Sequence, residues 1–363
     1  MRANDMKPEN FSKSHLPAIC RVSVIIKALN EEKRIAAAIE SALHAVRAVG
    51  GEVVLADSCS TDRTVDIAQA YPIRIVQLAH PQERRCGAGP QLGYQHSRGE
   101  FVYILDGDME MLDGFLEQAL DFMRSRPDIA GVGGNVVEQN KVSLEYVSRE
   151  ERVNTHMKPG QVDRLDGGGL YRRSAIEASG YLSNRNLHSY EEFDLAVRLR
   201  SQGWTLWRLP FDVSRHFGHD VPHYRLLVAR WQTRYVCGLG ELLRASLGRP
   251  HLRLVINGLR ELRIYLGVMA WWAILLSIFF WPQSAGMRIA SCGVLLLAPL
   301  VLLTGYKRSL KKGLYSMVSW CFSTAGLVRG LLLRQRPATE PISSHILREP
   351  TGFCPFPTQD VRQ

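Results

Sequence analysis

The sequence predicts an α/β domain with a doubly wound, mostly parallel, Rossmann-like sheet, followed by amphipathic interfacial helices and C-terminal transmembrane helices. Two observations predict this. Short apolar segments alternate with helical segments over residues 19–221, and strands that alternate with helices in this way form a parallel sheet. Beyond residue 263, two segments of 18 residues carry no charged side chain, which is close to the length that crosses a bilayer.

Strands and helices are expected in regular alternation along the first part of the chain. Each expected strand is a short aliphatic run, and the intervening helices carry apolar residues three and four positions apart. The expected strands are 22–26, 52–56, 73–78 and 101–105, and the expected helices are 31–48, 61–70 and 89–97. Ligands of doubly wound sheets bind beyond the carboxyl ends of the strands, so functional residues are expected there.

The charge of the chain is unevenly distributed, and its distribution distinguishes a membrane surface from nucleic acid as the partner. Residues 1–221 hold 27 Lys and Arg against 30 Asp and Glu, whereas residues 222–363 hold 18 against 5, so the net charge of +10 arises in the C-terminal part. Basic residues mixed with long apolar runs indicate an anionic membrane surface and argue against nucleic acid. The seven cysteines show no C-x-x-C spacing, which argues against a disulfide framework or a structural zinc site.

Three apolar segments follow one another in the C-terminal part. Residues 264–281 and 289–306 are uncharged and long enough to span a bilayer. The third segment, 313–328, is diluted by serine and threonine. It is therefore open whether this segment spans, lies in the interface or packs as a core helix.

The distribution of Lys and Arg around these segments predicts their orientation. Arginines precede the first segment, and a Lys- and Arg-rich loop at 307–312 follows the second. By the positive-inside rule, residues 1–263 and this loop lie in the cytoplasm, and the protein is expected in the cytoplasmic (inner) membrane. A third span would place the tail outside, against the positive charge of Arg334 and Arg336.

The stretch before the first apolar segment is rich in arginine and aliphatic residues. Residues 224–263 hold eight arginines and two acids, which is typical of amphipathic helices on an anionic leaflet, although the basic face of a soluble helix has the same composition. The expected organisation is a flexible N-terminus (1–18), an α/β domain (19–221), interfacial helices (222–263), two to three transmembrane helices (264–333) and a flexible tail (334–363).

Asp106-Gly107-Asp108 is the central polar cluster, because it directly follows the apolar run 101–105. Two carboxylates separated by one small residue can share Mg²⁺ or Mn²⁺. Such an ion takes its remaining ligands from water and substrate phosphates.

Two other predicted strands also end in polar residues. The hydroxyls that follow Asp57 favour a turn and a helix start, which leaves this carboxylate free to accept from a base N–H. Asn30, Glu31 and Glu32 follow the first strand, and each glutamate is either a first-turn acid of the next helix or a ligand contact.

These segments, in this order, resemble the family 2 inverting glycosyltransferases of the membrane-anchored bacterial type, which have a GT-A fold. The resemblance covers residues 19–235. It rests on the segments SVIIKALNEE, DSCSTDRT and DGD, on the glycine-rich segment DGGGLYRR and on YEEFDLAVRL. The family usually has Pro-Thr-Tyr-Asn where this chain has Lys-Ala-Leu-Asn at 27–30.

The resemblance implies a role for each matching position. Glu192 stands where the family has its catalytic aspartate and would take the proton of the acceptor hydroxyl, with Glu191 as the alternative base. Asp57 would bind the base of a nucleotide sugar, Asp106 would contact ribose or metal, and Asp108 would hold the metal on the pyrophosphate. The other expected contacts are Asn30, Glu32, Arg84 and Arg85 on the donor side, Gly168, Gly169 and Arg172 on the acceptor side, and His216 beside the metal.

Two departures from known patterns narrow the prediction. Leu227 replaces the glutamine of the Gln-x-x-Arg-Trp motif of processive synthases, which favours addition of a single sugar. His216, His219, Asp220 and His223 have helical metal-site spacing, but Gly218 and Pro222 interrupt the helix that a separate zinc site would need.

We therefore expect a membrane-bound inverting transferase that uses Mg²⁺ or Mn²⁺ in cell-surface glycan synthesis. It would move one sugar from a nucleotide-diphosphate donor to polyprenyl phosphate or a lipid-linked glycan. The alternatives are a processive polysaccharide synthase and a non-catalytic nucleotide-binding membrane module.

Overall fold

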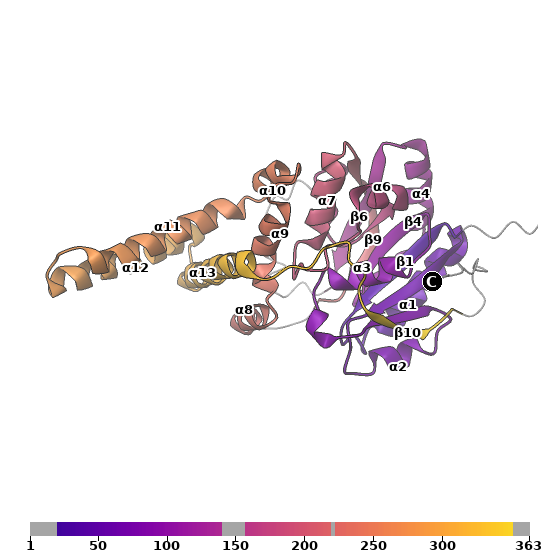
Figure 1. Ribbon diagram of the computed structural model, residues 1–363, viewed down its shortest axis with the longest axis horizontal. Coiled ribbons are helices and arrows are strands. Elements are labelled where there is room, and N and C mark those ends of the chain that lie inside the picture. Colours follow the sequence, from indigo (N-terminus) through magenta and orange to yellow (C-terminus); the bar gives the residue numbers. More distant parts are fainter. Residues whose placement is uncertain (1–19, 140–156, 219–221, 351–363) are drawn as a thin grey trace, which may run out of the picture.

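The computed structural model describes residues 20–139, 157–218 and 222–350 of the chain. Figure 1 shows an α/β domain from which two long helices project, with further helices packed at the junction. The expected N-terminal segment 1–18 lies outside the described residues.

The sheet of the α/β domain has ten strands, and its first half is parallel as expected. Strands β3, β2, β1 and β4 are parallel neighbours in this order. Beyond β4 the order continues β8-β6-β9-β5 with mixed directions, while β10 extends the opposite edge next to β3 and β7 pairs with β9. The strands are β1 (Val22–Ala28), β2 (Gly51–Asp57), β3 (Arg74–Leu78), β4 (Phe101–Asp106), β5 (Met109–Met111), β6 (Ile129–Glu138), β7 (Gly160–Val162), β8 (Gly169–Arg172), β9 (Thr205–His216) and β10 (Ser344–Arg348).

Helices cover both faces of the sheet, which explains the continuous apolar runs in its central strands. In β1, Val24 and Ile26 belong to the core cluster beneath α1 and α4, whereas Ile25 belongs to the cluster beneath α3 and α7. The helices of the domain are α1 (Ile35–Val49), α2 (Thr64–Ala68), α3 (Ala88–Gln95), α4 (Phe115–Ser125), α6 (Arg173–Ser179) and α7 (Glu191–Ser201).

Two of these helices are shorter than the sequence predicts. Helix α1 begins at Ile35 instead of residue 31, and α2 covers only Thr64–Ala68 of the expected 61–70. The polar residues before both helices bind one another: the backbone N–H of Glu31 donates to Thr64 Oγ1 at 2.7 Å. Side chains that bind nearby backbone groups in this way compete with helix formation.

A layer of helices follows the sheet and ends in a projecting hairpin. These elements are α8 (His223–Gln232), the 3₁₀ turn η3 (Tyr235–Cys237), α9 (Gly238–Ser246), α10 (Leu252–Gly258), α11 (Glu261–Phe280), α12 (Ala285–Lys307) and α13 (Leu310–Leu332). Helices α11 and α12 form the hairpin, and Trp271 Nε1 of α11 donates to the Leu295 carbonyl of α12 at 2.9 Å.

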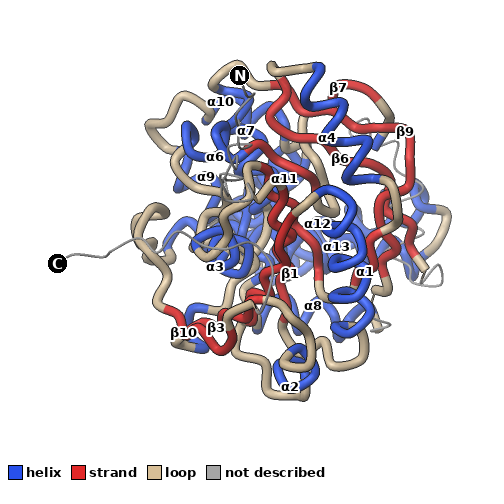
Figure 2. The backbone as a smooth tube through the Cα atoms, turned by 90° about the vertical axis from the view of Figure 1, so that its right-hand side faces the viewer, coloured by secondary structure: helices blue, strands red, loops and turns tan. Residues whose placement is uncertain are grey.

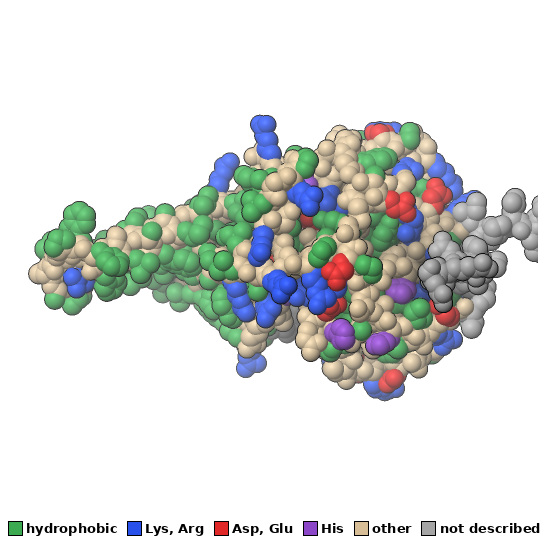
Figure 3. Space-filling model, in the orientation of Figure 1, with side chains coloured by type: hydrophobic (Ala, Val, Ile, Leu, Met, Phe, Trp, Pro, Cys, Tyr) green, Lys and Arg blue, Asp and Glu red, His purple; other side chains and the backbone are tan. Residues whose placement is uncertain are grey.

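Among the described helices, α11 and α12 are the two that are long and apolar enough to cross a membrane. Their most apolar windows have mean hydropathies of 1.8 and 2.0, and only 11% and 0% of these windows is buried inside the protein. Figure 3 shows the hydrophobic surface of the hairpin, with Lys and Arg side chains gathered where it meets the domain. A helix of a soluble core would bury such side chains.

Helix α13 contains the third apolar segment, and it packs onto the helical layer. Its glycines permit close backbone contact: a Cβ at Gly326 would lie 2.4 Å from the Val236 carbonyl oxygen, and one at Gly330 would lie 2.1 Å from that of Cys237. Thr324 and Leu327 on the same face are buried. The helix packs against η3 and α9 and also along α12 and α11, so whether it spans, lies in the interface or packs as a core helix stays a prediction.

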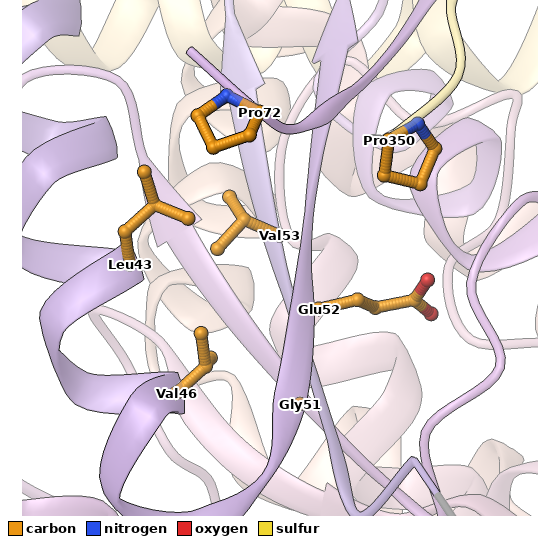
Figure 4. A pocket seen from close by; sticks show the side chains of 7 residues that line it. All are labelled: Leu43, Val46, Gly51, Glu52, Val53, Pro72 and Pro350. Carbon is orange, nitrogen blue, oxygen red and sulfur yellow. The ribbon is translucent and has the colours of Figure 1, made fainter. Parts of the chain in front are cut away.

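The prediction of a flexible tail from residue 334 is wrong for the part that the structure describes. Residues 334–350 return to the α/β domain, and β10 pairs antiparallel with the edge strand β3 (Figure 2). Pro350 then closes a small pocket at the beginning of β2, together with Leu43, Val46 and Val53 (Figure 4). The proline content of this segment gives no indication of the five-residue strand β10, whose partner strand β3 is more than 250 positions away in the sequence. Because this segment binds the catalytic domain, the tail lies on the same side of the hairpin as that domain.

Candidate active site

The carboxyl ends of β1, β2 and β4 meet the beginning of α7 and the end of β9, and this is where most of the expected site residues lie. The pairing register of the strands explains why some of these residues lie together. Lys27 of β1 pairs with Asp106 of β4, and Ala28 pairs with Asp57 of β2, so the ends of three parallel strands are level.

Lys27 joins the strand end to helix α7. Its Nζ lies 2.9 Å from Asp106 Oδ1 and 3.3 Å from Glu191 Oε1. Burial disfavours the charge of this lysine, but Asp106, Glu191 and Glu192 outweigh burial and hold its pKa well above the usual value. A small pocket is lined by Lys27, Glu191 and Glu192 together with apolar side chains from β4 and α7. Sequence reasoning treated Lys27 only as a departure from the family pattern.

The Glu192 carboxylate is held by backbone groups of the glycine-rich turn. Its Oε1 accepts from the N–H of Gly168 at 3.0 Å, and its Oε2 accepts from the N–H of Gly167 at 3.2 Å. The φ angle is positive at both glycines, +85° at Gly167 and +93° at Gly168. A Cβ at Gly168 would lie 2.5 Å from the Ile104 carbonyl oxygen. Burial raises the pKa of Glu192 to about 8, opposed by Lys27 and reinforced by Asp166 and Glu191. A carboxyl group with such a pKa is suited to accept a proton.

The acceptor-side residues expected from sequence separate into two groups. Gly168 binds Glu192, and Gly169 begins β8 directly beside it. Arg172 does not reach the site: its guanidinium donates to the carbonyls of Met123 and Ile129. Because β8 runs antiparallel to β4, three residues beyond Gly169 the chain is already near the other end of the sheet.

On the opposite side of the site, Asp108 meets an oriented histidine. His216 Nε2 lies 3.2 Å from Asp108 Oδ2, and its Nδ1 lies 2.6 Å from Glu138 Oε2. Glu138 pairs with His216 in the β6–β9 register, and the sequence offered no local signal for it. The contact with Asp108 raises the pKa of His216 to about 9 against the effect of burial, with a further contribution from Glu138.

Of the two glutamates after β1, Glu31 rather than Glu32 faces this cluster. A Cβ at Gly107 would lie 2.9 Å from Glu31 Cγ. Burial, followed by the charges of Asp108 and Asp106, raises the pKa of Glu31 to about 7. Glu32 is exposed and accepts from the backbone N–H of Arg63 at 3.2 Å, so it shapes the neighbouring turn.

Asp57 is buried at the end of β2 with one oxygen bound and one available. Its Oδ2 accepts from the Ser60 N–H at 2.9 Å and from Gln77 Nε2 at 2.8 Å. Its Oδ1 is buried and has no hydrogen-bond partner among the described residues. Leaving a buried carboxylate oxygen unsatisfied is costly, which points to a donor supplied by a ligand.

Asn30, Arg84 and Arg85 lie around the Asp57 loop and not beside the Asp-Gly-Asp segment. Asn30 Oδ1 accepts from the Thr61 N–H at 2.8 Å, which ties the two loops together. Arg84 donates to the carbonyls of Ser58 and Cys59 and so braces the same loop. Arg85 is partly buried among Glu83, Glu241, Arg185 and Arg234, at the junction with the helical layer, and burial lowers its pKa.

Within the described part of the chain, no group of three or more His, Cys, Asp and Glu side chains is arranged to hold a metal ion. The spaced histidines considered for a zinc site lie partly outside it, since His219, Asp220 and the side chain of His223 are not described. Asp108 and His216 still fit a hard divalent cation. A carboxylate on Nδ1 orients the other ring nitrogen of a metal-binding histidine, and Mg²⁺ is commonly held by one or two carboxylates plus substrate phosphates.

Comparisons with known proteins agree with this geometry. The family model described as glycosyl transferase family 2 matches residues 23–180. EpsE of Bacillus subtilis, a protein assigned as a glycosyltransferase, is 28% identical over 199 residues, 52% of this chain and 70% of EpsE. A dolichyl N-acetyl-glucosaminyl phosphate glucuronosyltransferase of Methanococcus voltae is 23% identical over 54% of this chain and 66% of its own length.

Comparison with solved structures supports the assignment of the fold. A mannosyltransferase of Pyrobaculum calidifontis, in complex with GDP-Man and Mn²⁺, superposes with a TM-score of 0.55 at 20% identity, over 86% of this chain and 88% of that one. At this identity the likeness concerns the fold.

Proposed function

The chain belongs to the family 2 glycosyltransferases, and from this premise we propose that it transfers a single sugar, with inversion, from a nucleoside-diphosphate sugar to a lipid-linked acceptor at the cytoplasmic face of a membrane. The observation that carries the proposal is the position of Lys27. Its ammonium contacts Asp106 at the donor strand end and Glu191 beside Glu192, so one cation bridges a donor-side and a base-side carboxylate, and Lys27, Glu191 and Glu192 line one small pocket.

Glu192 is the general base of the proposed reaction. Its carboxylate takes the proton of the acceptor hydroxyl as the hydroxyl oxygen forms a bond to the anomeric carbon. The bond between that carbon and the diphosphate oxygen breaks, and its electron pair leaves with the nucleoside diphosphate. The N–H groups of Gly167 and Gly168 hold the carboxylate in place, and Glu191 is the less suited base because it is paired with Lys27.

Asp57, Asp108 and His216 form the donor side. The free Oδ1 of Asp57 would accept an N–H of the nucleotide base, while Gln77 and Ser60 fix the other oxygen. Asp108 and His216 would hold Mg²⁺ or Mn²⁺, and the bound ion would supply positive charge to the departing diphosphate. Asp106 is paired with Lys27 and lies between the two sides.

The helical part supports an acceptor that resides in the membrane. The α11–α12 hairpin exposes its apolar side chains, and basic side chains surround its base (Figure 3), where they can face an anionic leaflet. Arg85 lies near Glu241 of α9 in the helical layer, where burial lowers its pKa and Glu241 and Glu83 oppose this effect. Its guanidinium is suited to the phosphate of a lipid acceptor, and the Methanococcus relative is named for a dolichyl N-acetyl-glucosaminyl phosphate.

The donor is tested by calorimetric binding of UDP-, GDP- and dTDP-sugars to the detergent-purified full chain, with and without Mn²⁺. We expect metal-dependent binding of one donor that Asp108→Ala abolishes. The matched control is Asp113→Ala, because Asp113 is an exposed aspartate on the loop before α4. No binding of any donor by the folded wild-type chain would refute the proposal.

The acceptor is tested with the same protein and membrane-extracted lipids. One product carrying a single sugar is expected, with slower transfer to the lipid acceptor in Arg85→Ala. A ladder of product lengths would instead indicate a processive synthase, and transfer only to soluble acceptors would refute the lipid-linked assignment.

A further inference from the structure

The C-terminal segment 334–350, here called the strap, crosses the α/β domain after α13 (Figure 1). It is bound along its whole length. Gln95 exchanges two hydrogen bonds with the backbone of Ile342, at 2.9 and 3.1 Å. The Ala79 N–H donates to the Ser343 carbonyl at 2.9 Å, and β10 pairs with β3 beyond it.

The first part of the strap binds a buried carboxylate next to the donor loop. Glu83, only 8% exposed, accepts from Arg336 of the strap at 2.8 Å and from Arg185 at 3.0 Å. Arg185 also donates to the carbonyls of Glu340 and Pro341, at 2.9 Å each. The Arg185 side chain is buried and that of Arg336 is 60% exposed, and removal of either partner leaves the charge of the buried carboxylate less well compensated.

This junction reaches the donor site through the next residue of the chain. Arg84 follows Glu83 and donates to the carbonyls of Ser58 and Cys59. These two residues directly follow Asp57. A shift of Glu83 therefore moves the side chain that braces the Asp57 loop.

The strap also holds the segment that leads into α7. The side-chain amide of Asn186 donates to the Arg336 carbonyl at 2.8 Å, and its oxygen accepts from the Arg336 N–H at 2.9 Å. Gln335 Nε2 donates to the Glu241 carbonyl at 2.8 Å, and the Glu241 carboxylate binds the N–H of His188, three residues before Glu191. The loop that follows Asp57 and the segment that leads into α7 are thus both held by the strap.

We infer that the strap is a positioning element of the active site, in which Arg336 and Glu83 hold the Asp57 loop ready to bind the donor. Neither residue touches the reacting groups. The inference rests on the proposed function for its meaning in catalysis. Its structural part is independent of that function, since it concerns the order of the loop in the protein without donor.

The first test is hydrogen exchange on the full chain in detergent without donor. In Arg336→Ala we expect the amides of Ser60 and Thr61, which are bound to Asp57 and Asn30, to exchange several-fold faster than in wild type. The matched control is Arg334→Ala, an equal loss of charge two residues away at an exposed side chain. Equal exchange in the two variants would overturn the inference whether or not any donor binds.

The second test separates positioning from folding. Arg336→Ala should weaken donor binding about threefold to tenfold, with kcat and the melting temperature close to those of Arg334→Ala. Glu83→Gln should weaken it similarly, and the double variant should add little to either single change. Additive effects, or a lower melting temperature with unchanged donor affinity, would contradict a positioning role. Failure of the wild type to bind any donor would refute the proposed function and leave the exchange test to decide this inference.

Discussion

The two sides of the active site contain the same kind of side chain in different surroundings. On the β4–β9 side, Asp108 faces the imidazole of His216, which Glu138 fixes from behind. On the α7 side, Glu192 is buried against two backbone N–H groups of a glycine turn, and its pKa is raised to about 8. Asp108 thus lies beside a ring nitrogen of an oriented histidine, whereas burial gives Glu192 a pKa at which it can gain and lose a proton near neutral pH.

Lys27 connects the two sides and limits the charge of each. It contacts Asp106 and Glu191. Family 2 glycosyltransferases usually have proline at the position of Lys27. Without this cation, the carboxylates of Asp106, Glu191 and Glu192 would lose the positive charge that lies beside all three. The comparison therefore predicts that substitutions on the two sides change different measured quantities: metal-dependent donor binding on the Asp108 side and kcat on the Glu192 side.

The largest expected effect is on the cation side. Asp108→Asn keeps the shape of the side chain but removes the charge that would hold the ion, so transfer should fall by about three orders of magnitude. Donor affinity should also lose its dependence on Mn²⁺. Initial rates and calorimetry over a Mn²⁺ series measure both, with Asp113→Asn as the control. Activity of Asp108→Asn within tenfold of wild type would remove this carboxylate from the cation side.

The base side should respond in kcat and not in donor binding. Glu192→Gln removes the proton acceptor and keeps one oxygen that can accept from the glycine N–H groups, so kcat should fall by about 10²- to 10³-fold with donor affinity within twofold. Glu191→Gln should cost about tenfold or less, because that carboxylate is paired with Lys27. The reverse order of the two effects would make Glu191 the base.

The sequence could predict those parts of the site that follow directly from local pattern. Asp57, Asp106 and Asp108 come immediately after aliphatic runs that could only be buried strands, and parallel strands bring their ends together. Glu192 is predicted by resemblance, whereas the glycine-rich segment is expected on the acceptor side, and its hydrogen bonds to Glu192 are seen only in the structure. Each of these signals lies within a few residues of the functional group.

The remaining parts depend on pairings between distant segments. Glu138 reaches His216 through strand register, Arg172 is carried away from the site by the antiparallel course of β8, and the tail finds the edge of β3. Helix α13 resembles α12 in length, yet its Gly326 and Gly330 lie against the backbone of η3 and its Gly313 lies against Thr304 of α12. Hydropathy counts side chains but does not show which of them meet another helix.

The pH dependence tests whether burial sets the state of Glu192. The base must be deprotonated to act, so with a pKa raised to about 8 the value of kcat/KM should rise with pH through that range and then level off. Lys27 lowers this pKa, so in Lys27→Met the rise should move to higher pH, and activity at neutral pH should drop about tenfold for each unit of displacement. A pH profile of the two proteins at saturating Mn²⁺ measures this. An unchanged midpoint in Lys27→Met would mean that the lysine does not act on the base.

The smallest and most local test concerns the glycine turn that holds Glu192. Gly168 and Gly180 both have positive φ, +93° and +98°, but a Cβ at Gly180 meets nothing within 4 Å, whereas one at Gly168 would lie 2.5 Å from the Ile104 carbonyl oxygen. Gly180→Ala should cost only the backbone strain of about 1 kcal/mol. Gly168→Ala should cost about 1–3 kcal/mol more, because the turn must move away from β4, and kcat should fall as the N–H groups leave the carboxylate. Chemical denaturation and kcat of the two alanine variants provide the comparison. If Gly168→Ala lost stability but kept kcat, the backbone anchor would serve the fold and not the base.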